Sequence, residues 1–269
     1  MKNLILGVLS ILFSNVIYAQ EHQDRHLHRG IVAFNKQDDE TALKHFEKEI
    51  IHNPTESQSY YYIGLIKNSK KQNDGCNYFS KAIELNPNYH EAYNSRSNCK
   101  SYKGDKLGAL EDLNNAITID STNFGYFFNR SGIKLDLEDF QGAIKDANKA
   151  LKLDDMTPSF VFGIIAKAYL GLGNYTEALK YATEYIQFEE FPSSYLVRAD
   201  IKFAMKDFKG ALEDYQKAND PDLDGGNTYV KIAKTKFALE DNKGACKAIA
   251  KASELGVKIE EDLLNKCEK

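Results

Sequence analysis

The chain has 269 residues, of which 42% are hydrophobic and 28% charged, the balance of a soluble folded protein. Its formal net charge is −4 and no run of Lys and Arg stands out, so neither nucleic acid nor an anionic membrane surface is an expected partner. Trp is absent and Pro occurs only 5 times, too few for an extended linker.

The N-terminal segment differs from everything that follows it. Lys2 supplies a positive charge, the stretch from Leu4 to Tyr18 is apolar apart from two Ser and one Asn, and Ala19 offers a small residue at a cleavage point. The run is short for a bilayer crossing, which favours a secretory signal over the alternative of an uncleaved anchor. We therefore expect residues 1–19 to be a signal peptide. The mature chain would lie outside the cytoplasm, without stable membrane insertion after cleavage.

Residues of matching kind recur about every 34 positions along the mature chain. An aromatic ring occurs at Tyr60, Tyr93, Phe127, Phe162, Tyr195 and Tyr229, with His26 in the equivalent first place, and a small residue follows four positions later at Gly30, Gly64, Ser97, Ser131, Ala166, Ala199 and Ala233. A second series comprises Ala42, Gly75, Ala109, Ala143, Ala178, Ala211 and Ala245, and a third comprises Glu49, Ala82, Ala116, Ala150, Tyr185, Ala218 and Ala252. Series that stay in phase over seven copies indicate a repeat protein.

Each copy is expected to form two helices. The apolar spacing between the markers is helical, and a polar turn such as Lys103-Gly104-Asp105 divides each copy. Two helices of a hairpin approach closely only where side chains are small, which accounts for the Gly, Ser and Ala positions. A single hairpin leaves an apolar flank exposed, so the copies must stack to build a continuous core.

This pattern resembles the tetratricopeptide repeat (TPR) family, and specifically an exported bacterial member. The best matches to its motif are Gly30, Ala42, Phe46 and Pro54 in the first copy, and Tyr60, Gly64, Phe79, Ala82 and Pro87 in the second. No copy has the Trp of the ideal motif. The resemblance implies an all-α fold, a right-handed solenoid of about seven helix-turn-helix repeats with a C-terminal capping helix.

The repeats are expected to fill residues 20–259. Their ranges are about 23–56, 57–89, 90–123, 124–158, 159–191, 192–225 and 226–259, followed by the capping helix at 260–269. In that helix Ile259, Leu263 and Leu264 would share one face.

Two positions in the copies change together. Arg96, Arg130 and Arg198 precede the small residue of the first helix, and the same three copies carry Asp112, Asp146 and Asp214 in the second helix. Three other copies carry Ile63, Ile165 and Ile232 with Tyr78, Tyr181 and Ala248 instead; the first copy breaks the rule, with Arg29 facing His45. Because a half-buried Arg needs a carboxylate, we expect structural Arg–Asp pairs inside these hairpins.

The cysteines form a second parallel. Cys76 and Cys246 occupy the same position in the second helix of their copies, and each is followed by a cysteine, Cys99 or Cys267, in the next helix. Four cysteines allow three connectivities. Repeat geometry favours Cys76–Cys99 and Cys246–Cys267, because each second helix packs on the next first helix. In an exported protein these pairs should oxidise.

Little in the sequence suggests catalysis. It contains no G-x-S-x-G, phosphate-binding Gly loop or H-E-x-x-H. Of three neighbouring histidines, His22, His26 and His28, the first two would share a helix face and offer a weak divalent-metal site, but His26 also occupies the ring position of the repeat. We expect no enzyme activity, no cofactor and no metal.

The resemblance implies a concave groove lined by the first helices, which would hold a protein or peptide partner. Counting positions places the following residues on or near it: Tyr61, Tyr62, Asn94, Asn98, Phe128, Asn129, Lys167, Asp200, Lys231 and Lys234. Some TPR proteins hold a carboxylate with two Lys, two Asn and an Arg. Asn98 and Asn129 match its amides and Lys167 its Arg, but Asn94 and Gly163 replace the two Lys, so most of its positive charge is missing.

The sequence therefore predicts a non-enzymatic interaction scaffold or adaptor outside the cytoplasm, periplasmic or secreted, in a Gram-negative bacterium. The bacterial assignment rests on the style of the signal and on the resemblance. Two alternatives remain open. One is a structural spacer in an envelope complex, and the other is a metal-binding activity at the N-terminal histidines. Neither the partner nor the oligomeric state follows from the sequence.

Overall fold

The computed structural model describes residues 26–69, 75–153, 159–188 and 190–267, and the regular structure in these ranges is helical. The chain forms two compact units, Met1–Thr122 and Asn123–Lys269. The expected signal peptide and His22 lie outside the described residues. Within those residues, no helix combines the length and the apolar character needed to cross a bilayer.

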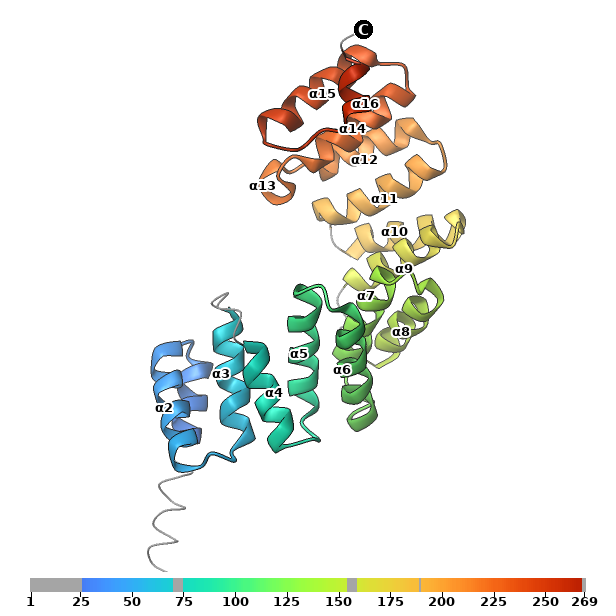
Figure 1. Cartoon of the computed structure of the whole chain (residues 1–269). Helices are drawn as coiled ribbons and strands as arrows, with labels where there is room; N and C mark the ends of the chain where they lie inside the picture. The colour runs from blue at the N-terminus through green and yellow to red at the C-terminus, as the bar shows by residue number, and fades with distance from the viewer. Residues whose placement is uncertain (1–25, 70–74, 154–158, 189, 268–269) are drawn as a thin grey trace, which may run out of the picture. The chain divides into compact units, whose positions relative to one another are not determined.

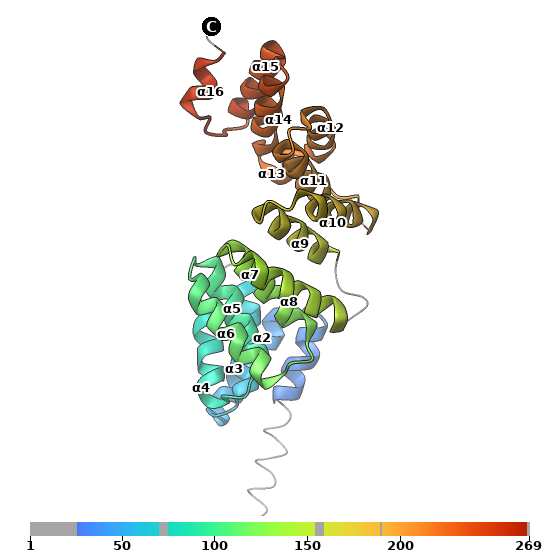
Figure 2. The ribbon, with the colours of Figure 1, turned by 90° about the vertical axis from the view of Figure 1, so that its right-hand side faces the viewer.

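The helices follow one another in chain order within each unit (Figure 1; Figure 2 gives a second view). Unit 1 contains helical residues 26–35 and then α2 (Asp39–His52), α3 (Ser57–Ser69), α4 (Gly75–Leu85), α5 (His90–Tyr102) and α6 (Lys106–Ile119). Unit 2 contains α7 (Phe124–Asp136), α8 (Phe140–Leu153), α9 (Phe160–Gly171), α10 (Tyr175–Phe188), α11 (Pro192–Ala204), α12 (Phe208–Ala218), α13 (Pro221–Asp224), α14 (Asn227–Ala238), α15 (Asn242–Glu254) and α16 (Glu261–Asn265).

Neighbouring helices pack as hairpins, and the hairpins stack. The hairpins are α3 with α4, α5 with α6, α7 with α8, α9 with α10, α11 with α12, and α14 with α15. Within a unit each second helix also packs on the next first helix, as α4 does on α5 and α10 does on α11. Each hairpin therefore buries its flank against the next one, and the expectation of an all-α repeat solenoid is confirmed.

One turn geometry joins the two helices of several hairpins. After α5, Gly104 has φ +85°; its N–H donates to the carbonyl of Ser101, and the N–H of Asp105 donates to that of Lys100. These two hydrogen bonds, with a residue in the left-handed conformation between them, are a common way for a helix to end. Asp105 then begins the next helix, because its carboxylate accepts the N–H of Gly108 at 2.9 Å. The polar turn Lys103-Gly104-Asp105 therefore ends α5 and begins α6 within three residues.

The small residues of the second series form the centre of each hairpin. Ala109, Ala143, Ala178, Ala211 and Ala245 are all fully buried. Their size lets the two helix backbones approach, and larger apolar side chains fill the layer between hairpins.

Two details of the C-terminal part differ from expectation. The sequence pattern did not predict α13, a four-residue helix that begins at Pro221 after the Asp220 side chain caps it. In the described part of the capping helix expected at 260–269, residues 260–267, the helix covers Glu261–Asn265. Leu263 is buried in it. Leu264 is 40% exposed, so it does not lie on the packed face, where the sequence pattern had placed it together with Leu263.

Candidate functional site

Unit 2 contains a groove on the side of its first helices. Phe128 of α7, Phe160, Gly163, Ile164 and Lys167 of α9, Tyr185 of α10, and Ser193, Leu196, Val197 and Asp200 of α11 line a space of about 350 Å³. α9 contacts both α7 and α11, so three successive first helices form the walls. The groove brings together three of the predicted binding residues, Phe128, Lys167 and Asp200.

A missing side chain creates this groove. Phe128, Gly163 and Leu196 occupy the same position in three successive first helices, so the row has a gap at its centre. A Cβ atom on Gly163 would lie 2.9 Å from Cε1 of Tyr185. Tyr185 in turn stands where most copies have Ala, and its ring is 2% exposed beneath the gap. Glycine above and tyrosine below are therefore complementary changes within one hairpin.

The two charged residues of the groove differ in their partners. Asp200 accepts two short contacts from Nζ of Lys231, at 2.6 and 2.7 Å, and a hydrogen bond from the Tyr215 hydroxyl at 2.7 Å. Burial and the Asp200 carboxylate raise the pKa of Tyr215. Lys167 is exposed and makes no hydrogen bond or ion pair with another described residue. The charge open to a ligand is thus the ammonium group of Lys167 beside an apolar gap.

Other predicted groove residues have packing partners. Tyr62 stacks on Phe46, with ring centroids 5.1 Å apart, and Tyr61 contacts Tyr89 with centroids 4.9 Å apart. Burial raises the pKa of Tyr61. These half-buried rings take part in the aromatic packing of unit 1, and their expected role in a groove stays a prediction.

The remaining predicted residues divide between the units. Asn94 and Asn98 lie on α5 in unit 1, where Asn98 is exposed; Asn129 lies on α7 in unit 2. In unit 2 Lys231 is bound to Asp200, and Lys234 forms an ion pair with Glu260 at 2.9 Å. Lys231 and Lys234 are therefore engaged within the protein.

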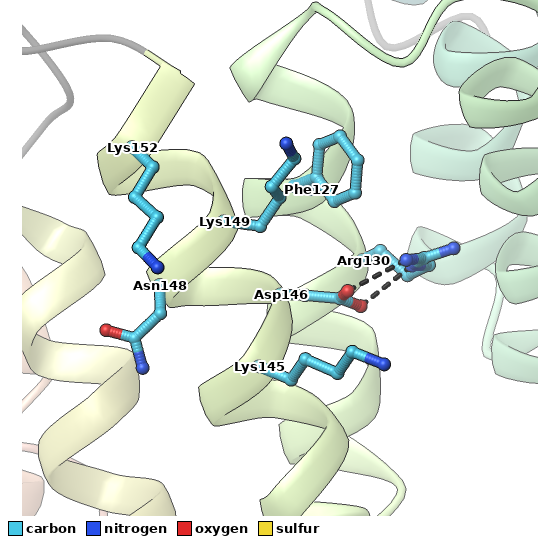
Figure 3. A pocket seen from close by; sticks show the side chains of 7 residues that line it. All are labelled: Phe127, Arg130, Lys145, Asp146, Asn148, Lys149 and Lys152. Atoms are coloured by element: carbon cyan, nitrogen blue, oxygen red, sulfur yellow. Dashed lines mark hydrogen bonds and ion pairs between the residues drawn. The ribbon is translucent and has the colours of Figure 1, made fainter.

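A second hollow in unit 2 is basic, and repeat packing explains part of it. Figure 3 shows Lys145, Lys149 and Lys152 projecting from α8, with the ring of Phe127 beside Lys149. Nζ of Lys149 lies 5.9 Å from the centroid of that ring. The equivalent lysines Lys217 and Lys251 lie over Tyr195 and Tyr229 in the same way. A cation over the first-helix ring is thus a recurring contact of the hairpin.

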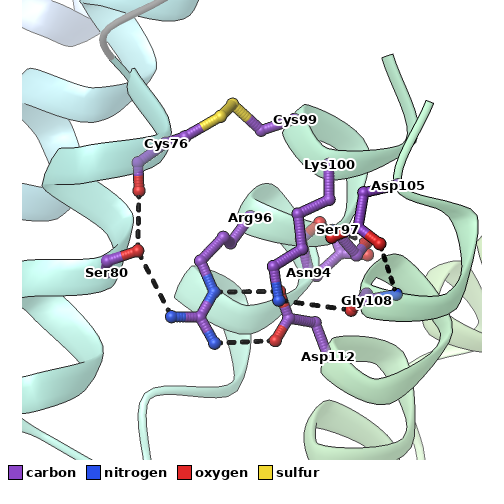
Figure 4. A network of polar contacts seen from close by, with 10 residues as sticks. All are labelled: Cys76, Ser80, Asn94, Arg96, Ser97, Cys99, Lys100, Asp105, Gly108 and Asp112. Carbon is purple, nitrogen blue, oxygen red and sulfur yellow. Dashed lines mark hydrogen bonds and ion pairs between the residues drawn. A yellow bond between two sulfur atoms is a disulfide. The ribbon is translucent and has the colours of Figure 1, made fainter. Parts of the chain in front are cut away.

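The three Arg residues of the sequence analysis meet their Asp residues inside the hairpins. Nε and Nη2 of Arg96 donate to Asp112 at 2.9 and 2.7 Å, and Nη1 reaches the Ser80 hydroxyl of α4 at 3.3 Å (Figure 4). Arg130–Asp146 and Arg198–Asp214 form the same bidentate ion pair. Asp112 is 1% exposed, so these pairs lie in the hairpin interior.

Each pair has a third member that the sequence analysis missed. Lys100, Lys134 and Lys202, four residues after each Arg, place Nζ 3.0, 2.8 and 2.7 Å from the same carboxylates. Burial alone would raise the pKa of Asp146 and Asp214, but the hydrogen bonds from Arg and Lys outweigh it and hold both pKa values below the usual range. The signal was present as Arg-x-x-x-Lys on one helix face.

The four cysteines lie in two disulfides. Cys76 of α4 is joined to Cys99 of α5, and Cys246 of α15 is joined to Cys267 beyond α16 (Figure 4 shows the first). In another hairpin the positions of Cys76 and Cys99 are taken by Ile144 and Ala168, which pack in one cluster. Each disulfide therefore replaces an apolar contact between stacked elements. Such bonds are compatible with an exported protein.

The first hairpin contains a histidine pair where the sequence analysis placed Arg29 against His45. Nδ1 of His26 lies 3.1 Å from Nδ1 of His45, and the His52 ring stacks on that of His26 with centroids 6.1 Å apart. Burial, neighbouring histidines, Lys48 and Arg29 lower the pKa of His26. Among the described residues, no group of three or more His, Cys, Asp or Glu is arranged to hold a metal ion.

The stacked helix pairs and the groove along the first helices place this chain in the class of helical-repeat solenoids. Comparison with solved structures shows which helical-repeat proteins have a similar fold. A TPR protein from Parabacteroides merdae superposes with a TM-score of 0.70 at 18% identity, covering 92% of this chain and 98% of that chain. Pseudomonas aeruginosa pilF gives 0.61 at 18%, covering 74% and 91%. YrrB, described as a TPR protein with an unusual peptide-binding site, gives 0.50 at 18%, covering 71% and 97%.

These similarities confirm the TPR resemblance at the level of the fold: the chain has the helical-repeat solenoid fold of these TPR proteins. No protein-family model and no curated protein matches its sequence.

Proposed function

We propose that the chain is a non-enzymatic scaffold that works outside the cytoplasm and holds an extended segment of a partner protein in the groove of unit 2. The observation that carries this proposal is the gap at Gly163, open between Phe128 and Leu196 and next to Lys167, which has no ion-pair partner among the residues that the structure describes. A concave apolar site with few polar groups is the usual form of a ligand site. The TPR fold, which YrrB combines with a peptide-binding site, supports the same conclusion.

The chemistry of the groove indicates the kind of segment. An apolar side chain of the ligand would fill the gap over Tyr185 and contact Phe128 and Ile164. A carboxylate of the ligand would lie near Lys167, because Lys231 already occupies Asp200. An apolar residue close to an acidic group, in an extended conformation along α9 and α11, satisfies both requirements.

Two features of the chain support the proposed location. The apolar N-terminal segment has the pattern of a secretory signal, and the four cysteines lie in disulfides, which persist in oxidising compartments. We propose a periplasmic or secreted protein of a Gram-negative bacterium. Two of the similar structures come from bacteria.

The test uses a variant that fills the groove with residues that the next hairpin already carries. Gly163→Leu with Tyr185→Ala gives the fifth hairpin the residues found at Leu196 and Ala218. The Ala removes the ring that a Cβ at position 163 would meet, so the fold should be retained. Lys167→Glu tests the charge separately, and Lys209→Glu, at an exposed position of α12, is the matched control.

Tagged protein is crosslinked in its own compartment and the captured proteins are identified by mass spectrometry. One abundant partner, lost in the filled-groove and Lys167→Glu variants and kept in Lys209→Glu, supports the proposal. Equal capture by all variants would contradict groove binding and favour a spacer that uses another surface.

A further inference from the structure

The Cys246–Cys267 disulfide lies in an open, positively charged pocket. Both cysteines line a space of about 490 Å³ together with Asn242, Lys243, Lys247, Ala250 and Lys266. The three lysines are exposed, and no carboxylate is among these lining residues. Nζ of Lys266 lies 5.4 Å from the centroid of the Phe237 ring, which holds this side chain beside the disulfide.

Access and charge both favour attack on this disulfide. The attacking species in thiol exchange is a thiolate, and the departing sulfur also leaves as a thiolate. Nearby ammonium groups stabilise both anions and lower the pKa of the leaving thiol. At the other disulfide Cys99 is only 5% exposed, so an attacking thiolate has access there through the partly exposed Cys76, whereas both Cys246 and Cys267 are partly exposed.

The C-terminal cap depends on this bond. Ile259, Leu263 and Cys267 pack on the apolar cluster of α14 and α15, and only Leu263 is buried. The Lys234–Glu260 ion pair is exposed on both sides and adds little. α16 has five residues, too few to hold a helix by itself in water. Once the crosslink opens, little remains to fix the cap on the last hairpin.

We propose that Cys246–Cys267 is a thiol–disulfide exchange site, reduced in preference to Cys76–Cys99, and that its reduction releases the C-terminal cap. A thiolate of a dithiol reductant attacks one of the two sulfurs and forms a mixed disulfide, and the other cysteine leaves as a thiolate that takes a proton from water. The second thiol of the reductant then displaces the first cysteine. The protein gains two thiols, and the dithiol is oxidised to its disulfide, with two electrons transferred.

The release has a defined structural consequence. The face of α14 and α15 that Leu263 covers corresponds to the surface that other hairpins present to their neighbours. Reduction would uncover the part of this apolar cluster that Leu263 and Ile259 cover, so the solenoid would end in an apolar face. This inference stands apart from the groove, because the cap and the groove residues belong to different helices.

The rates of reduction test the first half of the proposal. The full oxidised chain is treated with 2-mercaptoethanesulfonate, which is anionic, or cysteamine, which is cationic. Each disulfide is quantified over time by alkylation and peptide mass spectrometry. We expect Cys246–Cys267 to be reduced about tenfold faster than Cys76–Cys99. Lys243→Gln with Lys247→Gln should slow the anionic thiol by about threefold to tenfold and affect cysteamine less, an effect that high salt removes.

The matched control is Lys145→Gln with Lys152→Gln, which removes two exposed lysines from α8 far along the sequence from either disulfide. Equal rates at the two disulfides, earlier reduction of Cys76–Cys99, or no response to the Lys243 and Lys247 changes would overturn the exchange site.

Hydrogen exchange tests the second half. After selective reduction, amides of residues 257–267 should exchange faster while those of α11 and α12 keep their protection. The Cys246→Ser, Cys267→Ser variant should show the same cap exchange without reductant. A cap that stays protected in both samples would refute its release, whatever the reduction rates are.

Discussion

Replacement of Asp214 by Ala should destabilise the sixth hairpin strongly. The carboxylate is 2% exposed and accepts Arg198 Nε and Nη2, both at 2.7 Å, and Lys202 Nζ at 2.7 Å. Without it, two cations stay in the hairpin with no counter-charge. Breaking a buried pair in this way costs about 3–5 kcal/mol. Because the Arg198 and Lys202 side chains are each 19% exposed and can turn toward water, we expect the lower end, about 3 kcal/mol.

The fifth hairpin provides the compensating design. Its residues at the same three positions are Ile165, Tyr169 and Tyr181, and the two rings stack with centroids 5.7 Å apart. Arg198→Ile, Lys202→Tyr and Asp214→Tyr together transfer this apolar set into the sixth hairpin. A well-packed apolar replacement of a buried ion pair is often neutral or stabilising, so the triple variant should lie within about 1.5 kcal/mol of the parent.

The assay must resolve a single hairpin, because repeat arrays do not always unfold in one step. Native-state hydrogen exchange of α11 and α12 gives the local opening free energy, and urea titration by circular dichroism gives the global one. A loss below about 1 kcal/mol for Asp214→Ala would show that the pair behaves as a solvated surface contact. A triple variant as unstable as the single one would show that the carboxylate has a role other than neutralising its neighbours.

Three further outcomes follow from local geometry. Glu138 has φ 61° in the turn after α7, so Glu138→Gly should raise the urea-derived unfolding free energy by about 0.5–1 kcal/mol. The pKa values of His26 and His45 are lowered in the fold, chiefly by burial, so stability present above pH 6.5 should be lost as the pH falls through their folded pKa values. Thermal melting across pH 5–8 checks this, and His45→Ala should reduce the dependence of the melting temperature on pH. Replacing Cys76 and Cys99 by Ser should cost about 3 kcal/mol in the same titration.

The sequence predicts much of this fold because the seven copies of the repeat can be aligned with one another, which shows the positions that they share. The recurring Ala of the second series marked the helix crossing, and the joint change of Arg96 with Asp112 marked a contact between helices. The same comparison contained the Lys four residues after each Arg, but an exposed-looking Lys carries no sign of burial. The role of this Lys depends on whether its Nζ lies in solvent or beside the Asp carboxylate, and the packing of the two helices determines which.

The groove was predicted only in part, for a related reason. Counting helix positions identifies which residues face one side but not which of them are covered. Tyr61 faces that side and yet packs against Tyr89. The informative residue was Gly163, which interrupts a row of larger side chains, together with Tyr185 in a row of Ala. Their meaning emerges when the two helices are brought into contact, because each alone looks like ordinary variation of the motif.

The two disulfides have a consequence for where the chain yields. A linear array opens from its ends, since an end hairpin has one neighbour instead of two. Cys76–Cys99 ties the second hairpin to the third, and Cys246–Cys267 ties the last segment to the seventh. Under a pulling force or an attacking protease, the stretch between Lys100 and Ala245 lies outside both covalent loops. The same holds for the first hairpin at the N-terminal end, but of these two stretches only the middle one contains α9 and α11, so the helices that line the groove keep the freedom to adjust to a ligand.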